Sequence, residues 1–181
     1  DERQWAWMDE GLTTFVQYLA EQEFGEKYPE IIAPLDKFPS DRGPAQLITD
    51  YMSVDQNFLA PIMSNPENVY YLGPNAYGKP AAALNILRET IMGKELFDYA
   101  FKTYSQRWMF KHPTPEDFFR SMEDASAVDL DWFWRGWFYT TDYVDIGLKE
   151  VNQYFVSPEP GEESVHAHQI GMEYPMICFN F

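Results

Sequence analysis

The fold of this chain is decided by the stretch Trp7-Met8-Asp9-Glu10-Gly11-Leu12-Thr13-Thr14-Phe15. From its second half onward, apolar residues recur at the spacing of a helix with one buried face, and they are Leu12, Phe15, Val16, Leu19 and Ala20. The pattern predicts a helix from about Asp9 to Phe24, with Glu10 at its entrance. A carboxylate held there by a buried helix is rigid enough to bind a metal ion. The ordinary alternative is a first-turn glutamate that is favoured by the helix dipole.

A second stretch, Ala76-Tyr77-Gly78-Lys79-Pro80, opens another segment with an apolar face in helical register. It predicts a helix over about 78–92. Pro80 is compatible with this helix, because proline is tolerated in the first helical turn, where its missing N–H needs no partner. Tyr77 has an ordinary alternative too. In a chain with 12 tyrosines, a half-buried tyrosine that closes the core is common.

Three more helices are predicted after the second stretch, over about 94–109, 115–126 and 129–139. Thr114 fits the N-cap of the middle one, with Pro115 at its first helical position. Between Gly25 and Asn75 the chain is interrupted by seven prolines, so short helices and turns are expected there.

These stretches resemble the zinc aminopeptidase family of gluzincins, which includes alanyl aminopeptidase and leukotriene A hydrolase. The family writes its third-ligand segment as W-L-N-E-G-F-A-x-Y and carries Y-x-K-G at a later helix. The resemblance implies that Glu10 is the glutamate ligand of a catalytic Zn²⁺ and that the Tyr77 hydroxyl stabilises the oxyanion. The separation of 77 − 10 = 67 positions is close to that of the family, and Pro80 stands where the family usually has glycine.

The resemblance covers roughly residues 4 to 150, in order, although no single motif is specific. It implies a mainly α fold, the helical lobe of a thermolysin-like (gluzincin) metallopeptidase catalytic domain, with a few strands near the C-terminus. The implied activity is zinc-dependent removal of N-terminal residues from peptides.

The expected domain organisation has four parts, the first being the helical part of the catalytic domain over residues 1–142. Alternation of period two from Tyr143 to Val151 predicts a strand within 143–156 that leads into a following β region. Residues 157–164 have the composition of a linker, and 165–181 form a strand segment that resembles an exopeptidase motif.

A gluzincin site also needs two histidines from H-E-x-x-H, whose glutamate activates the zinc-bound water. The three histidines here, His112, His166 and His168, belong to no such motif, so the chain holds at most one of three expected protein ligands. We therefore expect an incomplete catalytic domain that is inactive alone, with Zn²⁺ bound in the complete enzyme. His166 and His168 would share one face of a strand, but a chance pair on a polar segment is the commoner explanation.

Near the C-terminus, Gly171-Met172-Glu173-Tyr174 resembles the family's exopeptidase signature G-x-M-E-N, with Gly171 at the variable position and Tyr174 in place of asparagine. The resemblance implies that Glu173 binds the α-ammonium group of the substrate. In the family this element precedes H-E-x-x-H, whereas here it follows everything else. Three explanations stay open: a chance match, a rearranged chain, or a chain joined from separate pieces.

Charge and composition limit the classes of partner. The net charge of −16 argues against binding nucleic acid through a basic surface and fits a peptide amine, although a solvated acidic surface is its main explanation. The apolar runs are too short to span a membrane. The single cysteine, Cys178, excludes an internal disulfide. No signal peptide is visible, but a chain that starts inside a motif would have lost one, so an extracytoplasmic location stays open.

Two rival functions also stay open. Acidic residues together with Trp132, Trp134 and Trp137 are what a glycoside hydrolase or sugar-binding module uses. Their helical spacing of i, i+2 and i+5 points them to different faces, which favours packing instead. The other rival is a non-catalytic helical scaffold with a peptidase-like fold, which the missing histidines favour only if the sequence is complete.

Overall fold

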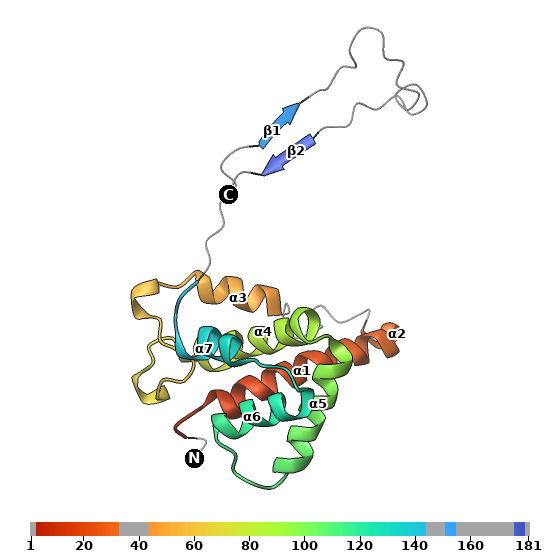
Figure 1. The fold of residues 1–181 in the computed structure, drawn as a ribbon, viewed down its shortest axis with the longest axis vertical. Coiled ribbons are helices and arrows are strands. Elements are labelled where there is room, and N and C mark those ends of the chain that lie inside the picture. Colours follow the sequence, from red (N-terminus) through yellow and green to blue (C-terminus); the bar gives the residue numbers. More distant parts are fainter. Residues whose placement is uncertain (1–2, 33–43, 144–150, 155–175, 180–181) are drawn as a thin grey trace. The chain divides into compact units, whose positions relative to one another are not determined.

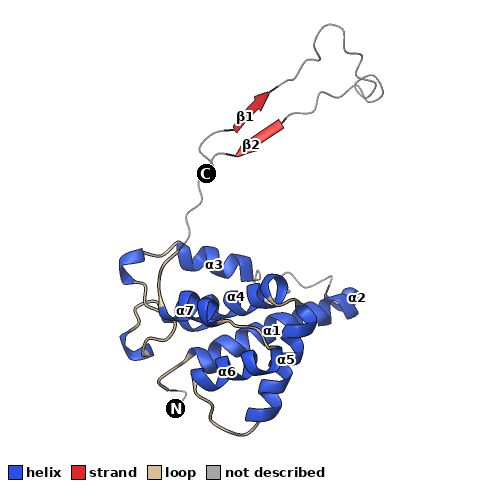
Figure 2. Ribbon diagram, in the orientation of Figure 1, coloured by secondary structure: helices blue, strands red, loops and turns tan. Residues whose placement is uncertain are grey.

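The computed structural model describes residues 3–32, 44–143, 151–154 and 176–179. The chain divides into two compact units, residues 1–142 and 143–181, which we describe separately. The described part of the first unit consists of helices joined by loops (Figure 2). In the second unit, β1 (Val151–Tyr154) pairs antiparallel with β2 (Met176–Phe179). The predicted strand over 143–151 meets the described residues only at its ends, so it stays a prediction, and residues 157–175 lie outside them.

The first helix, α1, runs from Trp7 to Lys27 and is longer at both ends than predicted. Its buried residues are Trp7, Met8, Gly11 and Phe15, which form one stripe on the helix. The prediction was partly wrong about this face, because the Val16 side chain is 46 % exposed and Ala20 is exposed as well. The core packs against the face of α1 that contains Gly11. Val16 lies on another face of this helix and is therefore exposed to solvent.

The described part of the proline-rich region folds into short elements, as predicted. They are α2 (Pro29–Ile32), α3 (Pro44–Met52) and two single 3-10 turns, η1 (Gln56–Phe58) and η2 (Pro66–Asn68). Each 3-10 turn is capped by the residue before it. The Asp55 side chain accepts from the Asn57 N–H, and the Asn65 side chain accepts from the Glu67 N–H.

The helix predicted over 78–92 begins earlier and is not a regular α-helix. It consists of the π-helical turn η3 (Gly73–Gly78), the α-helix α4 (Lys79–Ile86) and a second π-helical turn, η4 (Leu87–Ile91). Pro80 explains the first π turn. It has no N–H for the Ala76 carbonyl, and its ring would clash with that carbonyl in a regular α-helix, so the wider turn accommodates it.

The last three predicted helices are confirmed to within two residues, as α5 (Lys94–Trp108), α6 (Pro115–Ser126) and α7 (Asp131–Tyr139). The predicted cap of α6 is also confirmed. The Thr114 hydroxyl accepts from the Asp117 N–H, and the Asp117 carboxylate accepts from the Thr114 N–H, which completes a capping box.

The core is built largely from aromatic side chains, which accounts for much of the aromatic content of the sequence. The Trp7 ring lies 4.7 Å from Phe138, 5.8 Å from Phe119 and 5.9 Å from Phe118, measured between centroids. Such pairs add to the free energy of burial. The start of α1 is therefore fixed against α6 and α7 (Figure 1).

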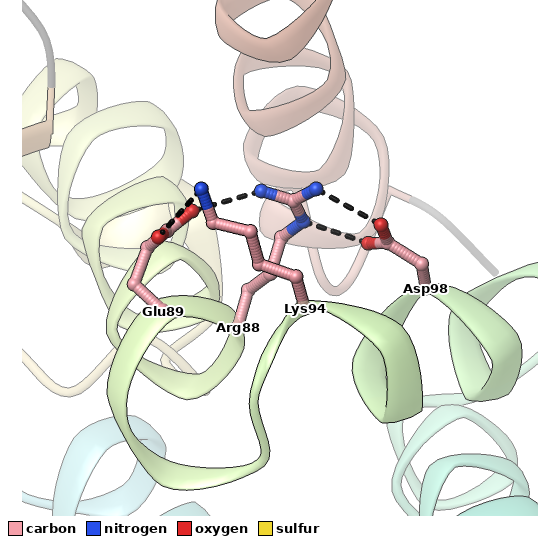
Figure 3. Close-up of polar contacts among 4 residues, drawn as sticks. All are labelled: Arg88, Glu89, Lys94 and Asp98. Atoms are coloured by element: carbon pink, nitrogen blue, oxygen red, sulfur yellow. Dashed lines mark hydrogen bonds and ion pairs between the residues drawn. The ribbon is translucent and has the colours of Figure 1, made fainter.

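The corner between η4 and α5 is held by four charged side chains (Figure 3). The Arg88 guanidinium binds both carboxylate oxygens of Asp98, at 2.7 and 2.9 Å, and a carboxylate oxygen of Glu89 at 2.8 Å. Lys94 reaches the other oxygen of Glu89 at 3.1 Å. This planar, two-pronged pairing fixes the direction in which α5 leaves the corner.

Candidate functional site

The structure places Glu10 in the first turns of α1, next to two buried neighbours. Met8, two positions before Glu10, and Gly11, directly after it, are buried. Glu10 itself is half-buried and Asp9 is exposed. The Glu10 backbone is fixed as well, because its N–H donates to the Ala6 carbonyl at 2.9 Å and its carbonyl accepts from the Thr14 hydroxyl at 2.6 Å. Its carboxylate therefore projects from a rigid position on α1.

Tyr77 lies in the π-helical turn η3, which packs against α1, and its hydroxyl lies near the Glu10 carboxylate. Interaction with this carboxylate, and then burial and the negative charges of Glu10 and Asp9, raise the pKa of Tyr77 above its ordinary value. The phenol therefore keeps its proton into the alkaline range and remains a donor. The side chain is 41 % exposed, so it can also be reached from solvent.

The contact between Glu10 and Tyr77 depends on a close approach of two backbones at Gly11. A Cβ atom added at Gly11 would lie 2.6 and 2.8 Å from the Pro80 ring and 3.0 Å from the Ala76 carbonyl oxygen. These distances leave no room for a side chain. Glycine at this position lets α1 lie directly against η3 and the first turn of α4.

Two buried polar side chains hold the same turn from its other sides. The Asn75 amide donates to the Ala60 carbonyl at 2.7 Å and to the Pro61 carbonyl at 3.1 Å. The Lys79 ammonium donates to the Thr140 carbonyl at 3.0 Å and lies 5.0 Å from the centre of the Tyr51 ring. Sequence reasoning missed both residues. The signal was available for Lys79, since a lysine at the start of an otherwise apolar helix is unusual.

The remaining predicted site residues are not placed. Gly171, Met172 and Glu173 lie outside the described residues, as do His166 and His168. The structure thus brings Glu10 and Tyr77 together and leaves the substrate-amine role of Glu173 a prediction. His112 is exposed in the connection between α5 and α6.

Among the residues that the structure describes, Glu10 belongs to no group of three potential ligands with adjacent donor atoms. The group that is found, Glu123, Asp129 and Asp131, lies elsewhere. Two of its carboxylates are already used to cap backbone groups: Glu123 accepts from the Leu130 N–H at 2.9 Å, and Asp129 from the Asp131 N–H at 3.1 Å. The described residues around Glu10 therefore fit one ligand position of a zinc centre and not the other two.

The three tryptophans that a sugar-binding surface would need do not form one. The Trp134 side chain is 3 % exposed and Trp132 is 61 % exposed, while Trp137 is half-buried against Phe133. They point in different directions, as the spacing predicted, so they do not make a stacking platform.

Residues 2–137 match the sequence model of the peptidase family M1 domain. The chain belongs to the M1 peptidase family. The matched range contains both Glu10 and Tyr77 and all of the helices from α1 to α6. No curated protein and no solved structure matches the chain. M1 peptidases are a zinc metallopeptidase family that acts on peptides. This is the family and the substrate class that the two sequence stretches implied.

No helix within the described ranges of this M1 peptidase chain has the length and apolarity to cross a membrane.

Proposed function

We propose that this chain contributes a zinc ligand and a transition-state donor to an aminopeptidase, an M1 enzyme that removes N-terminal residues from peptides. The observation that carries the proposal is the close approach of α1 to η3 at Gly11, which places Tyr77 near Glu10. Two residues that the family motifs single out, far apart in the sequence, meet on the surface of one helical unit.

The chemistry of the two side chains suits these roles. Glu10 is an acceptor-only carboxylate on a rigid helix, which is what a metal ligand requires. Tyr77 is a phenol that stays protonated at neutral pH and can donate to a developing oxyanion. A zinc ion held by this carboxylate would supply Lewis acidity to the scissile carbonyl and to a water molecule. The two histidine ligands would come from an H-E-x-x-H segment outside these 181 residues.

Glu173, with Gly171 and Met172, would bind the free ammonium group of the substrate and restrict cleavage to the chain end. This part of the proposal rests on the motif alone.

The test uses an enzyme that carries this chain together with an H-E-x-x-H helix, compared with the chain by itself. We expect the chain alone to hold no stoichiometric zinc by elemental analysis. In the enzyme, Glu10→Gln should lower the zinc content. Tyr77→Phe should retain zinc and lower kcat on the order of 100-fold, as removal of an oxyanion donor does. Tyr99→Phe, on an exposed tyrosine of α5, is the matched control.

Substrate preference separates an aminopeptidase from other peptidases. Peptides with a free N-terminus should be cleaved, and the same peptides with an acetylated N-terminus should not. Equal cleavage of both would contradict the aminopeptidase assignment. The alternative is a non-catalytic peptidase-like scaffold. It would be supported if the enzyme bound no zinc and Tyr77→Phe changed no activity.

A further inference from the structure

Lys79 is a buried cation two positions after Tyr77, and the proposed reaction does not use it. Its side chain is 4 % exposed. Burial lowers its pKa to about 8, against the weaker attraction of Asp142. An aliphatic side chain would avoid the cost of desolvating the ammonium. Stability alone therefore does not explain why a lysine stands at this position.

The contacts of the ammonium connect three elements at one point. Lys79 begins α4, the Thr140 carbonyl that it binds lies at the end of α7, and the Tyr51 ring beneath it belongs to α3. The Tyr51 hydroxyl is buried without a hydrogen-bond partner, so the ring is held there by packing and by the cation on its face.

The point that Lys79 holds is the end of the π-helical turn that carries Tyr77. The Lys79 N–H closes this turn with a bond to the Pro74 carbonyl. A π turn is less favourable than an α turn and persists where tertiary contacts support it. If it relaxed toward α geometry, the direction of its side chains around the helix axis would change.

The neighbours of Tyr77 agree with this view. Asn75, Ala76, Gly78 and Lys79 are all buried, and Tyr77 alone in this run is exposed. An exposed side chain cannot fix its own direction by packing. Its direction is inherited from the turn, which Asn75 holds at one end and Lys79 at the other.

We propose that Lys79 is a positioning residue, which keeps the π-helical turn in the register that points the Tyr77 hydroxyl at Glu10. The meaning of this role for peptide hydrolysis rests on the function proposed above, whereas the geometric statement does not.

The test follows Tyr77 directly in the 181-residue chain at neutral pH. Tyrosine labelled with ¹³C at Cζ gives one signal per residue, and Tyr77→Phe assigns the signal of Tyr77. Glu10→Ala gives the reference position of this signal without the carboxylate. We expect Lys79→Met to move the signal to that reference position in a chain that remains folded, since methionine matches the length of lysine and removes the buried charge. Lys102→Met, on an exposed lysine of α5, should leave the signal in place.

A folded Lys79→Met chain with an unmoved Tyr77 signal would overturn the proposal. Lys79→Gln is the second variant, because it keeps a polar group but is too short to reach the Thr140 carbonyl. If both variants unfold, Lys79 is needed for folding rather than for positioning, and the proposal is also overturned. None of these measurements needs zinc or hydrolysis, so their failure would leave the proposed aminopeptidase function standing.

Discussion

The Tyr77 hydroxyl lies near the Glu10 carboxylate, although 77 − 10 = 67 positions of chain separate the two residues. Neither side chain is buried, so neither is fixed by its own packing. The contact is produced by the backbones beneath them, where α1 and η3 meet at Gly11. The predictions below test this contact and the packing that creates it.

Removing the Glu10 carboxylate should lower the pKa of Tyr77 toward the ordinary value for tyrosine. Interaction with the Glu10 side chain is the largest cause of the raised pKa, and the charge of Glu10 adds to it. The measurement is an NMR titration of Tyr77 in the wild-type chain and in Glu10→Ala. Glu23→Ala, on an exposed position of the same helix, is the control and should leave the pKa unchanged. An unchanged pKa in Glu10→Ala would show that the two side chains do not meet.

Gly11→Ala should destabilise the fold by about 1–3 kcal/mol, the usual result of forcing an atom into a packed interface. The added Cβ would lie 2.6 Å from the Pro80 ring and 3.0 Å from the Ala76 carbonyl oxygen, so the two helical segments must separate. Urea unfolding measures the loss. The same variant should lower the pKa of Tyr77, because the separation moves it away from Glu10.

Gly136→Ala is the matched control for Gly11→Ala. Gly136 also lies in a helix, but no atom stands within 4 Å of its added Cβ. Alanine there should stabilise the chain by about 0.5–1 kcal/mol through its better helix propensity. Adding Pro80→Gly to Gly11→Ala should restore part of the lost stability, because it removes the two closest contacts. Equal effects of Gly11→Ala and Gly136→Ala would exclude the close approach.

Local sequence signals predicted most of the helical unit. Thr114 as N-cap and Pro115 at the first helical position fixed the start of α6, and the ranges predicted for α5, α6 and α7 agree with the structure to within two residues. These signals act within one or two turns of chain, so they can be read without a structure. The face of α1 was predicted less well, because the choice between Val16 and Gly11 as the buried row depends on a partner helix that the local pattern does not contain.

The candidate site also contains some residues that the sequence marks and others that depend on tertiary contacts. Glu10 and Tyr77 were found because family motifs mark them, and the spacing between them is a property of the sequence. No role was assigned to Asn75, or to Lys79 although it stands in the motif stretch, because their partners are backbone carbonyls at Ala60, Pro61 and Thr140, which carry no sequence signature. The π turn was missed too, since the effect of Pro80 on the preceding turn is visible only once the helix is known to begin before it.

Asp98→Asn should destabilise the corner between η4 and α5 by about 1 kcal/mol. It removes the charge from the two-pronged pairing with Arg88, whose side chain is 15 % exposed. We expect no more than this, because the Asp98 side chain is 51 % exposed and solvent screens the pair. The loss should shrink at high salt. Asp124→Asn is the control: its pairing with Arg107 is 3.5 Å long and exposed on both sides, so its effect should be near zero.

The free energy of unfolding should rise with pH from about 8 to about 10, by about 2 kcal/mol, because of Lys79. Burial lowers the pKa of Lys79 to about 8 in the folded chain, whereas in the unfolded chain it has the ordinary lysine pKa of 10.5. In this window the unfolded chain binds more protons than the folded one, so the equilibrium shifts toward folding as pH rises. Below the window the buried charge is present and its desolvation opposes folding in full.

The pH range over which stability rises depends on the groups that face Lys79 and on the tyrosines of the chain. Asp142 attracts the ammonium and limits the fall of its pKa, and the buried Tyr51 has a raised pKa of its own. Tyr51, Tyr77 and Tyr104 act in the opposite direction above about pH 10, because the unfolded chain then loses tyrosine protons that the folded chain keeps. Urea unfolding at intervals below that pH should show the rise in the wild-type chain and in Lys102→Met, and should show none in Lys79→Met. A rise that survives in Lys79→Met belongs to another group, and it would mean that the Lys79 ammonium is hydrated rather than buried against Tyr51.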